Sequence, residues 1–397
     1  MAALVATTIV TCLRAARLPN QFATEHWLVD YRFGVVKRGL VGSLVALITA
    51  ALRTRPSQAT IDALAVAAFV IFCAAIVWVS VRMVRRSHWS SEVTLAALVF
   101  LSSPFVVMSA HLVGYYDNIV VSLAIVSLAL VFAGRIGSAA IVQCLSLLVH
   151  ENTLLIAFPA VVWATFLTAP PSNAPRRRML PLLLPMVIFA LLAVRQATAP
   201  HHLERSLTQH LATYPFVAAT LPDVRVPHWI TIGFWESYVL HQGHFQERLL
   251  SQAMIALVFP STVALLGVLF AGDGLAAVSA PAAAVLAICL LPQSMHLLVW
   301  DTARTWTYSV LCAFLLLWVD IESAPERPRS SQFVRLVALL ALLVNAIGAT
   351  PLMDGLKEHF DVATRLWVYA PVFAVGVGLA RHSPSRASGE PDGKMVT

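Results

Sequence analysis

The chain has 397 residues, of which 59% are hydrophobic and only 12% are charged, about half the charged share of an ordinary globular domain. This composition excludes a cytosolic enzyme, a disordered protein and a receptor with a single membrane anchor, because each needs more charge or fewer apolar runs. The net charge of +7 fits the basic cytoplasmic loops of membrane proteins, and no motif indicates a nucleic-acid partner. The continuous apolar runs predict an all-α, polytopic transmembrane bundle.

Twelve apolar runs predict about twelve membrane spans. The first run, Ala2–Leu13, is short and is followed by Arg14 and Arg17, whereas the basic residues of a signal peptide precede its apolar stretch. The other runs lie at about 62–81, 92–110, 118–134, 137–149, 152–168, 179–195, 249–270, 274–293, 304–320, 332–350 and 365–380.

The apolar segment 39–52 is too short for a confident span. If it does not cross, all later basic loops fall on one side, so we expect a juxtamembrane helix lying in the membrane interface. Both termini are then cytoplasmic, and the Ala- and Arg-rich composition favours a bacterial plasma (inner) membrane. Residues 1–381 are expected to form one transmembrane domain, and 382–397 a disordered cytoplasmic tail. The expected outer loops are 14–61, 196–248 and 351–364.

Ionisable groups next to the membrane are costly, so each is a candidate for function. Four polar clusters fall at the predicted outer ends of spans, although their positions did not set the topology. Their candidate residues are Asp30, Lys37 and Arg38; Tyr116 and Asp117; His150 and Glu151; and Asp301 and Arg304.

Each cluster also has a structural interpretation. Asp301 and Arg304 are three residues apart on a predicted helix and could simply pair. Asp117 could cap the helix that follows it, and Lys37 and Arg38 could extend to lipid headgroups.

These residue types fit one reaction at an outer-face cavity. A carboxylate would deprotonate an acceptor hydroxyl, and Arg, Lys or a divalent metal would stabilise a leaving lipid phosphate. Hard carboxylate oxygens, with or without a histidine, suit Mg²⁺ or Mn²⁺.

The layout resembles the C-type (GT-C) superfamily of integral-membrane glycosyltransferases. Asp30 lies in a large first outer loop ahead of the juxtamembrane segment 39–52, and Asp117 and His150-Glu151 follow in the next outer turns. The first loop lacks the paired Asp-Glu dipeptide that some members carry. The resemblance implies a hexosyl- or pentosyltransferase that uses a polyprenyl-phosphate sugar donor and a glycan or lipid acceptor in the cell envelope.

The residues then receive predicted roles. Asp30 is the general base, while Asp117 and Glu151, with His150, hold a metal or orient the acceptor. The substrate-binding residues are Tyr116, Lys37, Arg38 and Arg304, with Asp301 orienting Arg304. Two alternatives remain open: a transporter or flippase, and a lipid-linked oligosaccharide polymerase or ligase.

Overall fold

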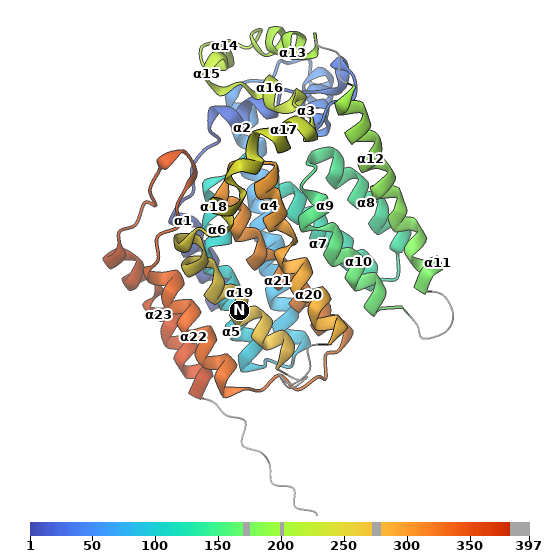
Figure 1. Cartoon of the computed structure of the whole chain (residues 1–397). Helices are drawn as coiled ribbons and strands as arrows, with labels where there is room; N and C mark the ends of the chain where they lie inside the picture. The colour runs from blue at the N-terminus through green and yellow to red at the C-terminus, as the bar shows by residue number, and fades with distance from the viewer. Residues whose placement is uncertain (170–174, 199–201, 272–278, 382–397) are drawn as a thin grey trace, which may run out of the picture.

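The computed structural model describes residues 1–169, 175–198, 202–271 and 279–381 (Figure 1). The predicted disordered tail, 382–397, lies outside these ranges. Within them the chain forms helices and no strand, which confirms the predicted all-helical fold. The bundle consists of α1 (Ala2–Leu13), α4 (Gln58–Arg86), α5 (Ser91–Leu101), α6 (Pro104–His111), α7 (Asp117–Phe132), α8 (Ile136–Val149), α9 (Thr153–Ile156), α10 (Phe158–Leu167), α11 (Pro175–Met179), η2 (Leu180–Leu182), α12 (Leu183–Ala197), α19 (Gln252–Phe270), α20 (Ala280–Leu290), η4 (Leu291–Leu297), α21 (Thr302–Ser323), α22 (Gln332–Ile347) and α23 (Val362–Arg381).

Seven helical stretches in the described chain are long and apolar enough to cross a membrane. Six further apolar helices have 10–17 residues. Each of the twelve predicted spans coincides with one of these thirteen stretches, and the thirteenth is the segment predicted to lie in the interface. The helices support a membrane protein, whereas the number of crossings stays a prediction. The seven are Gln58–Arg86, Ser91–His111, Arg177–Ala197, Gln252–Phe270, Ala280–Leu297, Thr302–Ser323 and Val362–Arg381.

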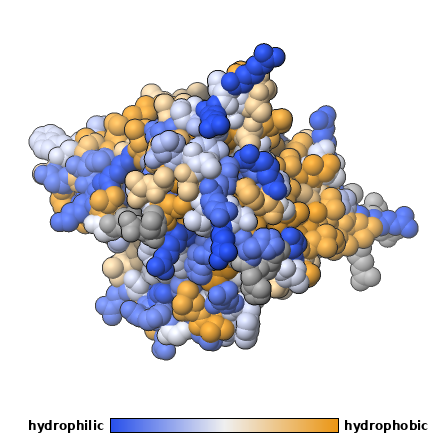
Figure 2. Space-filling view, turned by 90° about the horizontal axis from the view of Figure 1, so that it is seen from above, coloured by the Kyte–Doolittle hydropathy of each residue, from blue (hydrophilic) through white to orange (hydrophobic). Residues whose placement is uncertain are grey.

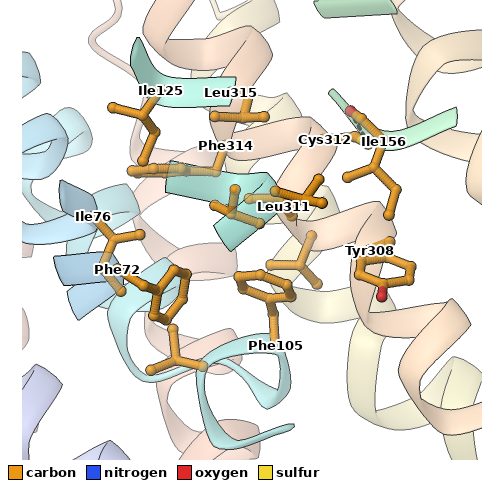
Figure 3. Packing of buried hydrophobic residues seen from close by; sticks show 14 of the residues in the cluster. Phe72, Ile76, Phe105, Ile125, Ile156, Tyr308, Leu311, Cys312, Phe314 and Leu315 are labelled. Atoms are coloured by element: carbon orange, nitrogen blue, oxygen red, sulfur yellow. Dashed lines mark hydrogen bonds between the residues drawn. The ribbon is translucent and has the colours of Figure 1, made fainter. Parts of the chain in front are cut away.

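Helix α21 runs through the middle of the bundle and is buried along nearly its whole length. Its Phe314 ring stacks on Phe100 of α5, with the ring centroids 3.6 Å apart. Phe105 of α6 and Leu311 of α21 continue this core toward Tyr308, as Figure 3 shows. Peripheral helices, unlike α21, expose large apolar side chains, as expected of a surface that faces lipid. On α12 these include Leu183, Leu191 and Val194.

Short helices cover one end of the bundle, called here the upper end (Figure 1). The first predicted outer loop contributes α2 (Gln21–His26), η1 (Tyr31–Phe33) and α3 (Gly39–Ala51). The described part of the second forms α13 (Leu203–Leu211), α14 (Pro215–Ala218), α15 (Leu221–Val224), α16 (Val226–Thr231), α17 (Phe234–His241), η3 (Gln242–His244) and α18 (Phe245–Leu249). The third contains η5 (Met353–Gly355).

The cover helices pack against the rest of the molecule, and their sequences show why. In α13, Leu203, Leu207 and Leu211 recur every four residues and are all buried, so this helix lays one apolar face on the structure below. Helix α3 lies directly on backbone: a Cβ built at Gly42 would come within 1.9 Å of the carbonyl oxygen of Val29. Glycine is the residue that permits this approach.

A buried ion cluster ties the third loop to the bundle. Arg14, at the end of α1, donates to both carboxylate oxygens of Glu358 at 2.9 Å. Arg365 of α23 donates to the same carboxylate at 2.9 Å. Because all three side chains are buried, the cluster fixes residues 350–365 against the ends of α1 and α23.

We expect Phe314→Ala to destabilise the protein strongly, because it removes a stacked ring from the central core and leaves a cavity. Such a loss costs about 3–5 kcal/mol of unfolding free energy. The measurement is the midpoint temperature of thermal unfolding in detergent. Phe333→Ala, which removes a ring that is 65% exposed, is the matched control and should change the midpoint little. Equal shifts in both variants would contradict the central position of α21.

Candidate functional site

A cavity of about 810 Å³ lies between the upper end of the bundle and its cover. Its walls come from α2, the start of α3, the turns before α7 and after α8, the helices α12, α16 and α17, and the segment from η4 to α21. Figure 2 shows the molecule from this end, with hydrophilic residues across the middle and hydrophobic residues mainly along the flanks. Seven of the predicted site residues line the cavity: Lys37, Arg38, Tyr116, His150, Glu151, Asp301 and Arg304.

The shortest hydrogen bond between charged side chains that line the cavity joins Arg38 to Glu151. Arg38 donates from Nε at 3.1 Å and from Nη2 at 2.5 Å to the two carboxylate oxygens. Both side chains are only 16% exposed. Burial alone would raise the pKa of Glu151, but the charge and hydrogen bonds of Arg38, together with His150 and Lys37, outweigh it and hold the pKa well below its usual value. Glu151 is therefore an anion at neutral pH.

Two neutral histidines flank this ion pair. His26 donates from Nδ1 to the carbonyl of Phe22 at 2.8 Å, which leaves Nε2 to accept from Arg38 at 3.4 Å. His150 accepts the backbone N–H of Asn152 at its Nδ1, at 3.1 Å. Burial, followed by the nearby charge of Arg38, lowers the pKa of each histidine to about 3. Both rings thus serve as uncharged hydrogen-bonding groups.

A second ion cluster lies where α7 and α21 begin. Arg304 pairs with Asp117 at 3.2 Å and with Asp301 at 2.7 Å. Asp301 also accepts the backbone N–H of Arg304 at 3.1 Å and so caps α21. Asp117 accepts from Asn152 at 2.7 Å. The pairing expected from the spacing of Asp301 and Arg304 is therefore present.

The structure corrects the capping interpretation of Asp117. This residue is the first of α7, and the helix has no side-chain cap. Asp117 is also not among the residues that line the cavity, because it lies behind Arg304 and Asn152, which both do. Its contacts hold these two side chains in place.

Lys37 carries a positive charge that no carboxylate of the described chain neutralises directly. Its ammonium donates to the carbonyl of Ile232 at 3.1 Å and lies 5.9 Å from the ring centroid of Phe234. Burial lowers the pKa of Lys37 to about 8. The side chain is therefore mostly protonated at neutral pH, and it lines the cavity from the side of α16 and α17.

Asp30 lies outside the cavity lining. It accepts three side-chain hydrogen bonds from Arg32, the shortest at 2.6 Å, and also the backbone N–H of Arg32 at 2.9 Å. Burial alone would raise the pKa of Asp30, but the hydrogen bonds from Arg32 outweigh it, and the pKa is lowered. Arg32 in turn contacts His210 of α13 at 3.3 Å. In this structure Asp30 holds the side chain of Arg32, through which η1 contacts α13.

The carboxylates do not form the ligand set that a magnesium or manganese ion requires. Glu151 and Asp117, the predicted metal ligands, are bound by Arg38 and Arg304 respectively. Across the described residues, no three His, Cys, Asp or Glu side chains gather in a way that could hold a metal. The geometry gives no support for a metal held between Asp117 and Glu151.

Sequence analysis assigned no role to Asn152, His26 or Tyr308. Asn152 bridges Asp117 and the hydroxyl of Tyr308, which lies 3.4 Å from its Nδ2. The adjacent His150-Glu151 pair could have indicated Asn152. His26 belongs to the polar cluster of the first outer loop, and Tyr308 falls within the predicted span 304–320; only the packing of separate segments brings them to the site.

The opposite wall of the cavity is apolar and aromatic. Its side chains come from α12, α16, α17 and the segment after η4. Helix α12 also exposes apolar side chains along its other face. The cavity thus combines a charged end with an apolar end, which suits an amphipathic ligand. These wall residues include Phe189, Trp229, Phe234, Leu297 and Leu298.

We expect the amine of Lys37 to become reactive at a pH well below that of an ordinary lysine. The neutral amine is the reacting form, so labelling with acetic anhydride should rise through a midpoint near pH 8, read by mass spectrometry of the Lys37 peptide. Glu151→Gln is the matched variant. Because the charge of Glu151 raises the pKa of Lys37, its removal should move the midpoint below pH 8. A midpoint near pH 10.5 would contradict the burial of Lys37.

No known family model, curated protein or solved structure matches this chain. An inference about its function therefore depends on the cavity itself: on the paired charges, the apolar wall and the ammonium of Lys37, which forms no ion pair among the described residues.

Proposed function

We propose that the chain is a membrane glycosyltransferase that moves a sugar from a polyprenyl-phosphate donor to a glycan or lipid acceptor at the upper end, on the extracytoplasmic face of a bacterial plasma membrane. The observation that carries the proposal is the cavity, which joins a cationic and carboxylate-bearing end to an apolar wall at the end of a hydrophobic bundle. A lipid-linked phosphate sugar has the same division between a charged head and an apolar chain.

The phosphate belongs at the Lys37 and Arg38 end of the cavity. Lys37 is mostly protonated at neutral pH, and its ammonium contacts a carbonyl and an aromatic ring. A phosphate oxygen offers this ammonium a better partner, and Arg38 borders the same space. When the bond between the sugar and the phosphate breaks, these cations stabilise the charge on the leaving phosphate.

Glu151 takes the role of general base in this proposal. It lines the cavity beside Lys37 and Arg38, whereas Asp30, for which the sequence predicts that role, lies outside the lining. The acceptor hydroxyl attacks the anomeric carbon, the bond to the phosphate breaks, and Glu151 takes the hydroxyl proton. A weakly basic carboxylate can accept this proton, because the hydroxyl becomes acidic as the new bond forms.

Arg304 and Asp301 border the same cavity from α21 and supply hydrogen-bonding groups to the sugar or the acceptor. Asp117 and Asn152 keep the Arg304 side chain in position. No step is assigned to a metal, since the carboxylates are committed to arginines.

The test is sugar transfer in membranes from a panel of radiolabelled hexosyl and pentosyl polyprenyl phosphates. Glu151→Gln should lower turnover by about 10²- to 10⁴-fold, the usual contribution of a general base, and should leave donor binding largely intact. Lys37→Met should mainly raise the KM for the donor. Asp30→Asn should retain most of its turnover.

Glu326→Gln is the control, because that carboxylate is 84% exposed at the opposite end of the bundle. Each variant is checked by size-exclusion chromatography, since the loss of Glu151 leaves Arg38 without its partner. Full transfer by Glu151→Gln would overturn the proposed base. Movement of lipid-linked sugar across the membrane without transfer would favour the flippase alternative.

A further inference from the structure

A second hollow lies on the side of the bundle, away from the cavity. It is an apolar groove of about 490 Å³ between α4 and α7. Three alanines and four larger apolar side chains line it; Ile125 is buried, whereas Trp78 and Val126 are 45% and 46% exposed. The lining residues are Ala74, Ala75, Trp78, Ile125, Val126, Ala129 and Leu130.

The groove leads along α4 to a cluster of arginines. Residues 74, 78, 82 and 86 recur every four positions, so they share one face of the helix. The guanidinium of Arg82 lies over the Trp78 ring, 5.6 Å from its centroid. Arg82 and Arg86 both face the single carboxylate of Glu322, so one positive charge is left over.

The α7 wall of the groove ends in the same way. Just past α7, the backbone N–H of Arg135 donates to the carbonyl of Leu130, a groove residue, at 2.8 Å. The Arg135 side chain is exposed. Both walls of the groove therefore run from apolar side chains to an arginine.

The dimensions match one leaflet of a membrane. From Ala74 to Arg82 the helix rises about 12 Å, at about 1.5 Å per residue. Half of a bilayer's hydrocarbon core is about 15 Å thick. A chain lying on the alanines would thus place its headgroup beside Arg82, Arg86 and Arg135.

We propose that this groove binds an anionic phospholipid, with one acyl chain along the alanines of α4 and α7 and the phosphate headgroup between Arg86 and Arg135. The surplus positive charge selects an anionic headgroup over a zwitterionic one. The site is separate from the cavity and does not depend on the sugar-transfer activity.

The experiment follows tryptophan fluorescence of the full chain in detergent, as phosphatidylglycerol or phosphatidylcholine with the same brominated acyl chains is added. Bromine quenches nearby indoles. The difference between the native chain and Trp78→Phe isolates Trp78 from the other nine tryptophans. We expect half-maximal quenching of Trp78 at a phosphatidylglycerol concentration at least about fivefold below that of phosphatidylcholine, since attraction to one basic residue alone provides about fivefold.

The double variant Arg86→Gln and Arg135→Gln should reduce this preference to about twofold or less. Arg381→Gln, a matched change at an exposed arginine of α23, should retain it. Ala129→Phe fills the groove without changing any charge and should weaken quenching by both lipids. Equal quenching by the two lipids in the native chain, or an equal effect of Arg381→Gln, would overturn the proposal.

Discussion

A buried charge at the end of an apolar bundle needs a partner, and this requirement organises the upper end of the molecule. Arg38 and Arg304 each meet a carboxylate from a distant part of the chain, Glu151 for the first and Asp117 for the second, and Arg304 also pairs with the neighbouring Asp301. Separating either pair would leave an uncompensated charge in a poorly hydrated place. The ion pairs therefore fix the relative positions of α3, α7, α8 and α21.

The same requirement distinguishes Lys37 from the other cations. Its ammonium contacts a carbonyl and an aromatic ring, Glu151 acts on it without forming an ion pair among the described residues, and burial makes its charge costly, as its lowered pKa shows. A ligand that brings a negative charge relieves this cost. In the proposed reaction, the phosphate of the donor is that ligand.

The helices and the clustering of polar residues at one end could be predicted from the sequence, because apolar runs and their charged ends are local signals. Lys37, Glu151 and Arg304 were found in this way. The place of Asp30 outside the cavity lining could not be predicted, since its ion pair with Arg32 depends on the turn that starts η1. Of the cover helices, α3 was predicted as the juxtamembrane segment, whereas the helices of the second outer loop were missed, because short amphipathic helices such as α13 carry too little apolar sequence to stand out from a loop. The number of spans and the glycosyltransferase resemblance stay predictions.

The contact between Gly42 and the carbonyl of Val29 has a consequence for a charge one helical turn away. One methyl group at position 42 would overlap that oxygen, so α3 would have to move outward or tilt. Arg38 stands immediately before α3, and its guanidinium would be carried along with the helix. The shortest contacts of the cavity would lengthen first, because a bidentate pair tolerates little displacement. The close backbone contact between Gly42 and Val29 thus determines the geometry of the Arg38–Glu151 ion pair, although neither of the two residues in contact carries a charge.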